Sequence, residues 1–223
     1  MGIIETRPPP QERNRDKTRK RILEAAESEF AANGLKGTRI AAIAELADCN
    51  KALLYHYFKN KQDLFTAVLE RTYAKIRSKE QKLELGHLAP QDAMRRLVEF
   101  SFDYVRQNPS FIKIINDENM HGARHLRASP EARKLNTPLV ATIARILTEG
   151  VARGVFRSGV DPVQLYITIA SVAYFYTANR ATLSVIFDLA DCDAAHAARR
   201  AHIGEVVLGY LRPDPTSDKG VSR

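Results

Sequence analysis

The chain has 223 residues, 44% hydrophobic and 27% charged, and its 34 Lys+Arg against 26 Asp+Glu give a net charge of +8. This composition is typical of a soluble globular protein that can bury a sizeable core. Two cysteines, Cys49 and Cys192, are too few for a disulfide framework, so we expect a reducing, cytoplasmic location. No apolar run approaches the length of a membrane span, and the polar N-terminus lacks a signal-peptide core.

Residues 1–15, with three consecutive prolines, are predicted to form a flexible basic arm. From Arg13 to Arg21, six cations accompany a single acid, Asp16, so the local charge is +5. Clustered cations release counterions from the phosphate backbone of DNA and give salt-dependent affinity. The pattern favours nucleic-acid binding, although a solubilising, disordered N-terminus has the same composition.

Residues 16–62 contain three helical patterns. The first runs from about Asp16 to Asn33 and ends at an Asn-Gly stop signal. Thr38 and Asn50 are predicted N-caps of the second and third helices. Two short helices joined by a polar turn are typical of a helix-turn-helix, whose second helix enters the DNA major groove. The predicted inward-facing residues are Ile22, Ala25, Ala26, Phe30, Ile40, Ile43, Ala44, Ala47, Leu54 and Phe58.

A fourth helix, about residues 61–85, is predicted to link this domain to a second one at 63–212, and residues 213–223 form a polar tail. The second domain shows helical periodicity from Pro90 to before Asn108, from Pro130 to Arg153, from Pro162 onward and from His196 to Leu211, with a short helix around Phe111. The segment from Gly122 to Ser129 has no clear periodicity and is expected to be irregular. Because the β-branched residues keep helical spacing throughout, the fold class is predicted to be all-α.

Three segments of this chain resemble the TetR (tetracycline-repressor-like) family of transcriptional regulators. They are Ile22–Gly34 (ILEAAESEFAANG), residues 37–44 (GTRIAAIA) and Leu54–Phe65 (LYHYFKNKQDLF). The likeness is strong over residues 16–70. The family's turn resembles Ala-Gly-Val-Ser, whereas here it is Ala-Asp-Cys-Asn at residues 47–50; Asp tolerates a left-handed backbone, and Asn can cap the helix as Ser would.

The resemblance implies a homodimer whose two recognition helices meet successive major grooves of a palindromic operator. It also implies that the second domain dimerises through its last two long helices and binds a small-molecule effector that changes the spacing of the two DNA-binding heads. Repression relieved by that effector is the commonest behaviour in the family. We therefore expect a ligand-responsive repressor that is not an enzyme and needs neither cofactor nor metal.

The predicted DNA contacts lie on the second and third helices and at the start of the fourth. At the first turn of the third helix, Lys51 can donate to guanine O6 and N7 or contact only phosphate, and Ala52 and Leu53 can contact a thymine methyl. Tyr57 is as suited to the core as to phosphate. The predicted set is Thr38, Arg39, Asn50, Lys51, Ala52, Leu53, Tyr55, His56, Tyr57 and Lys61.

Thr38 and Lys61 stand at helix starts, where main-chain N–H groups already favour an anion. Their own donors would add to that attraction, so phosphate contact is favoured over simple capping.

Candidate ligand contacts are aromatic, soft or polar residues of the second domain, although each also suits an ordinary core or a dimer contact. They are Phe102, Phe111, Met120, His121, Tyr174 and Asn179.

The second domain contains two groups of acidic and histidine residues. Glu118, His121 and His125 have a spacing that can bind a divalent metal, but the neighbouring glycine favours a solvated helix end. Asp193 and His196 are expected at the surface.

Two other function classes stay open: a constitutive DNA-architectural protein and an all-α, metal-dependent enzyme. Against the enzyme, the sequence has no phosphate-binding glycine loop, no GxSxG elbow and no HExxH pair. A buried cavity of a few hundred cubic ångströms in the second domain would favour a sensor, and a solid core would favour an architectural protein.

Overall fold

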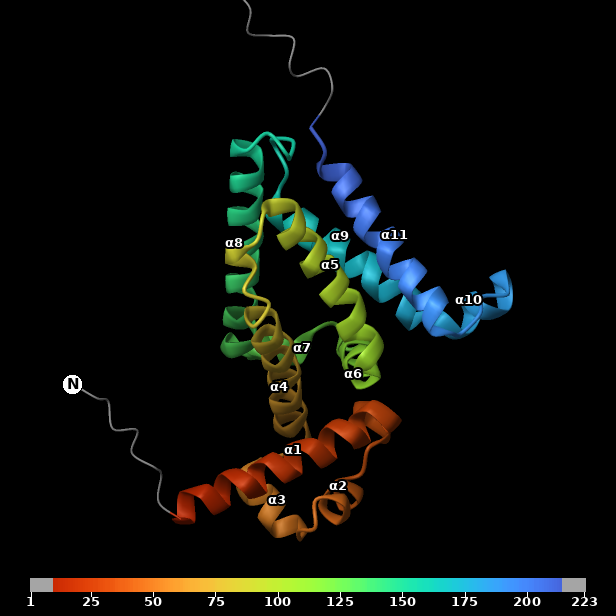
Figure 1. The fold of residues 1–223 in the computed structure, drawn as a ribbon. Helices are drawn as coiled ribbons and strands as arrows, with labels where there is room; N and C mark the ends of the chain where they lie inside the picture. Colours follow the sequence, from red (N-terminus) through yellow and green to blue (C-terminus); the bar gives the residue numbers. More distant parts are fainter. Residues whose placement is uncertain (1–9, 214–223) are drawn as a thin grey trace, which may run out of the picture. The chain divides into compact units, whose positions relative to one another are not determined.

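The computed structural model describes residues 10–213, except the side chains of residues 10–13, 132, 133 and 135–137. Every regular element within that range is a helix, which confirms the all-α prediction (Figure 1). The helices form two compact units. Unit 1 comprises the chain up to Thr72 together with Lys113–Ala132, and unit 2 comprises Tyr73–Ile112 together with the chain from Arg133.

Unit 1 holds the three N-terminal helices, the whole of α7 and segments of α4 and α6. Its elements are α1 (Pro10–Gly37), α2 (Ile40–Leu46), α3 (Lys51–Tyr57), the first part of α4 (Lys61–Gln81), the last part of α6 (Pro109–Met120) and α7 (Arg124–Ala128). The inward-facing residues predicted for α1, α2 and α3 lie in one core cluster, where Phe30 and Phe65 stack edge to face at 5.0 Å. Ile114 of α6 is fully buried in the same cluster.

Two segments of unit 1 differ from the sequence prediction. α1 begins at Pro10, so residues 10–15 are helical rather than part of an arm, while residues 1–9 lie outside the described range. Proline suits the first turn of a helix, and the Arg, Lys, Glu and Gln that follow are strong helix formers. The segment from Gly122 to Ser129 contains α7 instead of being irregular, because Gly122 and Ala123 adopt left-handed φ angles that end α6 and allow a new helix.

Unit 2 is built around α5 (Pro90–Gln107), which packs against α9 (Pro162–Ala178) and α11 (Asp193–Leu211) (Figure 1). The short helix η1 (Leu85–His87) precedes α5, and most of α8 (Pro130–Ala152) also belongs to this unit. The predicted start of α9 is confirmed, since the Asp161 carboxylate accepts from the Gln164 N–H at 2.8 Å. α4 ends at Gln81, before the predicted position near residue 85.

α10 (Arg180–Phe187) follows α9 directly, whereas the sequence pattern predicted one continuous helix from Pro162 onward. Asn179 ends α9 with its side chain donating to the Phe175 carbonyl at 2.9 Å, and α10 starts at the next residue. The pattern of apolar residues continues across this break, so periodicity alone could not reveal it. Within residues 10–213, no helix combines the length and apolar character needed to cross a membrane.

Candidate nucleic-acid interface

The turn between α2 and α3 has the geometry that its residues predict. Asp48 adopts a left-handed φ of 48°, which confirms the expected role of Asp in place of Gly. The Asn50 side chain accepts from the Leu53 N–H at 2.7 Å, so the N-cap prediction for Asn50 is also confirmed. The capped turn therefore fixes the position at which α3 begins, which is Lys51.

The first turn of α3 presents its side chains to solvent. Lys51, Ala52 and Leu53 are all exposed, whereas Leu54 is fully buried and anchors the helix to the core. The exposed turn offers one cationic donor beside two apolar groups. These are the chemical types that read guanine edges and thymine methyl groups in a major groove.

Two cations of the basic segment brace the motif. Arg21 donates from Nη2 to the Asp48 carbonyl at 3.3 Å and lies 3.7 Å from the Asp48 carboxylate. The Arg19 guanidinium lies 5.5 Å from the centre of the Phe58 ring. Burial raises the pKa of the Cys49 thiol, with Arg21 opposing the effect, so this turn residue is a neutral thiol at pH 7. The basic segment thus supports the turn and adds positive charge next to α3.

The aromatic residues of α3 divide by exposure. Tyr55 is 47% exposed and His56 is exposed, so both are free to donate to phosphate oxygens. Tyr57 is half-buried and packs against the core cluster of unit 1. Of the two roles left open for Tyr57, the structure favours packing.

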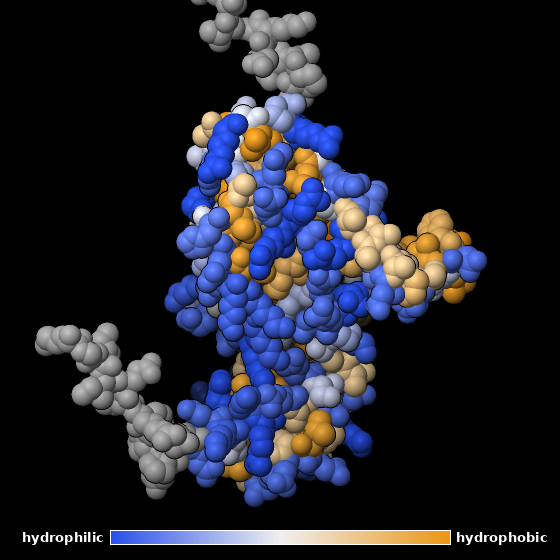
Figure 2. Space-filling view, viewed as in Figure 1, coloured by the Kyte–Doolittle hydropathy of each residue, from blue (hydrophilic) through white to orange (hydrophobic). Residues whose placement is uncertain are grey.

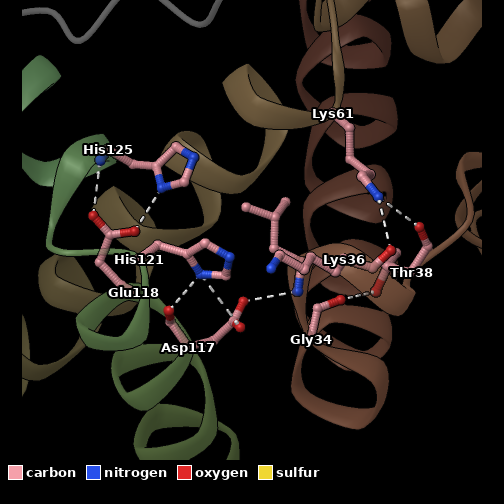
Figure 3. A network of polar contacts seen from close by, with 9 residues as sticks. Gly34, Lys36, Thr38, Lys61, Asp117, Glu118, His121 and His125 are labelled. Carbon is pink, nitrogen blue, oxygen red and sulfur yellow. Dashed lines mark hydrogen bonds and ion pairs between the residues drawn. The ribbon is translucent and has the colours of Figure 1, made fainter.

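Thr38 and Lys61 have structural partners instead of the free donors that were predicted (Figure 3). Thr38 is 2% exposed, and its hydroxyl oxygen lies 2.7 Å from the Gly34 carbonyl and 3.0 Å from the Glu29 carbonyl, which share its single proton as acceptors. The N-cap of α2 is Arg39, not Thr38, and Arg39 is exposed without a side-chain cap bond. The buried hydroxyl has acceptors within α1, so the structure favours a structural role for it, and the phosphate contact of Thr38 stays a prediction.

The Lys61 ammonium donates to the Thr38 carbonyl at 3.0 Å and to the Lys36 carbonyl at 3.3 Å. It therefore ties the start of α4 to the link between α1 and α2. Carbonyls at the end of a helix favour a cation, which accounts for Lys at this position.

A second polar cluster joins α6 and α7 to the end of α1 (Figure 3). Gly34 has a left-handed φ of 67°, and the N–H of Leu35 donates to the Asp117 carboxylate at 2.7 Å. The ring Nδ1 of His121 lies 2.7 Å from the Asp117 carbonyl. Sequence reasoning missed Asp117, because nothing local to residue 117 indicates a partner 82 positions earlier.

Glu118 and His125 are buried, which contradicts the solvated helix end that their neighbouring glycine favours. Glu118 is 1% exposed and His125 is 6% exposed. One oxygen of Glu118 accepts from the N–H groups of His125 and Leu126 at 2.8 and 3.0 Å, and the other lies 2.5 Å from His125 Nδ1. His125 lies on α7, and its ring also packs edge-on against Phe65. No group of three or more metal-ligating side chains occurs within the described residues.

The six candidate ligand residues are not brought together. Met120 is 85% exposed and His121 contacts Asp117, both in unit 1. In unit 2, Phe102 is fully buried in the core and Asn179 caps a helix. Phe111 packs edge-on against Tyr73 and Tyr104, and Tyr174 is half-buried on α9.

The last acid–histidine pair also differs in detail from its prediction. His196 pairs with Asp191 at 3.2 Å rather than with Asp193. The Asp191 carboxylate is exposed, and its hydrogen bond and charge interaction with Arg180 lower its pKa, with a smaller contribution from His196.

Known proteins with the same layout are DNA-binding regulators. Residues 22–68 match the family model for bacterial regulatory proteins, tetR family, and residues 90–207 match the tetracyclin repressor-like, C-terminal domain. The chain is 41% identical to the HTH-type transcriptional repressor NicS of Pseudomonas putida, over 88% of this chain and 93% of that protein. It is 30% identical to the HTH-type transcriptional repressor SCO4008 of Streptomyces coelicolor, over 72% and 79% of the two chains.

Two solved structures share the fold. The putative transcriptional regulator SCO4942 from Streptomyces coelicolor is 25% identical, with a TM-score of 0.65 over 87% of this chain and 98% of that one. The transcriptional regulator FadR from Bacillus subtilis, in complex with stearoyl-CoA, is 17% identical, with a TM-score of 0.67 over 86% and 99%.

Proposed function

Since the chain belongs to the TetR family of transcriptional regulators, we propose that it is a homodimeric repressor that binds a palindromic operator and is released by a small molecule. Unit 1 supplies the DNA-binding surface, and unit 2 supplies the dimer contact and the effector site. Two relatives that match most of this chain are named transcriptional repressors, which supports repression over activation.

The observation that carries the proposal is the first turn of α3. Lys51, Ala52 and Leu53 project outward from a helix whose capping residue and buried face are both fixed. Tyr55 and His56, one turn later, are exposed and suited to the flanking phosphates. An exposed helix start with base-reading side chains, braced by a second helix, is how helix-turn-helix proteins dock in the major groove.

Dimerisation is supported by apolar side chains that unit 2 leaves exposed on α9 and α11. A single folded copy rarely leaves so many large apolar groups in water without a partner surface. They are Val163, Ile167 and Phe175 on α9, and Val206 and Tyr210 on α11. α10 adds Val185, Ile186 and Phe187, which form the orange patch at the right of Figure 2. A two-fold dimer through these helices would pair two copies of α3 for successive grooves.

An effector is supported by hollow space in unit 2. An open groove of about 640 Å³ is lined by residues of α4, α5 and α11, among them Arg95, Phe100 and Tyr104. This volume is within the range of small-molecule sites, which supports a sensor, although the groove is open and is not the buried cavity expected of one. The FadR structure with stearoyl-CoA supports the capacity of this fold to hold a small molecule.

Selection of DNA from a random pool tests the proposal. The full-length protein should enrich a two-fold symmetric sequence with half-site centres roughly 34–36 Å apart, one helical turn of DNA. Affinity should fall steeply with salt concentration, since phosphate contacts release counterions. Enrichment of no sequence above the starting pool would reject the operator-binding role.

A further inference from the structure

Unit 2 contains a charged pair inside an otherwise apolar region. Arg77 and Glu80 lie three residues apart on α4, and their side chains are each 7% exposed. Arg77 donates from Nη1 to the Glu80 carboxylate at 2.5 Å and from Nη2 to the Tyr166 hydroxyl at 3.1 Å. The Nε–H of Arg77 is buried and has no hydrogen-bond partner. Buried polar groups in native proteins are nearly always satisfied, so an unpaired guanidinium N–H points to a missing acceptor.

A small cavity adjoins the pair. Its volume is about 50 Å³, and one wall carries Arg77 and Glu80. The remaining lining is neutral, with Gln81, Leu85, Pro138, Leu139 and Thr142. Since a water molecule takes roughly 30 Å³, the cavity suits the charged end of a molecule rather than a whole effector. Arg77 and Glu80 are the charged groups among these lining residues, and α8 and η1 contribute uncharged ones. The Tyr166 hydroxyl of α9 contacts Arg77 but is not part of the lining.

The electrostatics favour an anion at this place. Burial raises the pKa of Glu80 to about 7, even though the neighbouring Arg77 charge and hydrogen bond act in the opposite direction. Near neutral pH a substantial fraction of Glu80 is therefore protonated, and the buried guanidinium then has no counterion. A carboxylate from outside would supply that counterion and could also accept from Nε. Guanidinium groups bind carboxylates through two parallel N–H bonds.

Arg71, two helical turns earlier on α4, provides a contrast. Its guanidinium bonds Glu24 at 2.7 Å and the Lys20 carbonyl at 3.2 Å, and Glu27 lies within 4.0 Å. Arg71 is thus surrounded by acceptors belonging to the fold, and it borders none of the cavities described above. Of these two arginines on α4, Arg77 is the one with a buried N–H that has no acceptor.

We propose that Arg77, held in place by the Tyr166 hydroxyl, anchors the carboxylate of a small-molecule effector in the cavity beside α4 and α8, and that Glu80 takes up a proton from solvent when that carboxylate replaces it at the guanidinium. The inference rests on the proposed function, because it defines the chemical class of the effector. The O–H of Glu80 is the one covalent bond that forms, and every other new contact is a hydrogen bond or an ion pair. Where Glu80 starts ionised, the site carries one negative charge against Arg77 before and after binding; where Glu80 starts protonated, the bound carboxylate supplies that charge.

Sodium acetate is the probe, since it carries the proposed group and little else. Acetamide is its neutral counterpart, and sodium chloride at equal ionic strength controls for screening. Thermal unfolding of the full-length protein is followed against concentration of each solute at pH 6, 7 and 8. We expect acetate alone to raise Tm saturably, with roughly fivefold weaker binding at pH 8 than at pH 7, because the protonated fraction of Glu80 falls by about that factor above its pKa of about 7.

Variants separate this site from unspecific binding. Arg77→Gln should abolish the acetate effect, while Arg212→Gln, an exposed arginine that lines neither the cavity nor the larger open groove, should retain it. Glu80→Gln mimics the protonated carboxyl and should keep acetate binding but lose its pH dependence, so it tests the proposal even if Arg77→Gln fails to fold. Tyr166→Phe should weaken binding without changing that dependence.

Several results would overturn the proposal. They are an acetate effect no larger than that of chloride or acetamide, an effect of equal size in Arg77→Gln, or an unchanged pH dependence in Glu80→Gln. Operator binding without solute is measured beside these assays. If the wild type does not bind an operator, the proposed function is rejected. The acetate results test separately whether Arg77 anchors a carboxylate.

Discussion

Polar residues serve opposite ends in the first turn of α3 and in the α6–α7 cluster. Lys51 is exposed at a helix start, and its ammonium is available to a partner outside the chain. Asp117 and Glu118 instead accept bonds from Leu35 and His125, and Glu118 is almost fully buried. Both regions had suggestive spacing in the sequence. The difference teaches that a polar side chain is free for function only when the fold has left its bonds unused.

The largest expected effect is on the buried side of this comparison. Glu118→Ala should destabilise the protein by about 3 kcal/mol, because the N–H groups of His125 and Leu126 and the ring of His125 lose their acceptor in a buried site. Thermal unfolding measures the change. Glu45→Ala, on the exposed face of α2, is the matched control and should leave Tm nearly unchanged. Equal Tm values for the two variants would show that the buried acid is not structural.

Glu80 gives a pH-dependent version of the same test. Because its pKa rises from 4.5 to about 7 on folding, the folded state holds the proton more tightly than the unfolded state. The wild type should therefore lose stability relative to Glu80→Gln as pH rises from about 4.5 to 7, by on the order of 3 kcal/mol in total. Urea unfolding of both proteins between pH 5 and 8 checks this. Parallel stability curves would contradict the raised pKa.

The exposed apolar face of unit 2 gives the next effect. Ile167, 49% exposed on α9, should become buried in the dimer. Ile167→Asp would place an unpaired charge in that contact, so we expect the dimer dissociation constant to rise roughly 30-fold, or about 2 kcal/mol. Sedimentation equilibrium measures it, with the exposed Ser78→Asp as control. An unchanged dimer in Ile167→Asp would exclude this face as the contact.

Lys61 separates structural from DNA-contacting cations. Lys61→Ala removes the bonds to the Thr38 and Lys36 carbonyls, so it should lower stability by about 1 kcal/mol. A phosphate contact would instead reduce the salt dependence of DNA binding by about one unit without affecting Tm. Measuring both on the same variant distinguishes the two roles. A changed salt slope with an unchanged Tm would restore the phosphate role inferred from sequence.

The sequence predicted the elements whose determinants are local. Asn50, Asp161 and Pro90 each mark a helix start through their own chemistry, and the buried face of α1 follows from its spacing. Contacts between distant segments were not predictable in this way. Thr38 was assigned to DNA because its bonds to Glu29 and Gly34 depend on how α1 ends.

The sequence did not reveal the buried ion pair for a related reason. Arg77 and Glu80 have the ordinary spacing of a solvated ion pair on a helix, and their significance comes only from burial against Tyr166. Likewise, the six ligand candidates were chosen by residue type, whereas the fold distributes them over both units. Residue type and spacing identify candidates, and burial decides among them.

The central claim is that the first turn of α3 reads bases, and a comparison of operator preferences tests it most directly. DNA selection is performed in parallel with the wild type, with Lys51→Ala and with Lys59→Ala, a cation that is also exposed but lies beyond the end of α3. We predict that Lys51→Ala relaxes the preference at one position in each half-site, while Lys59→Ala leaves every position unchanged. An identical preference for Lys51→Ala and the wild type would contradict the account.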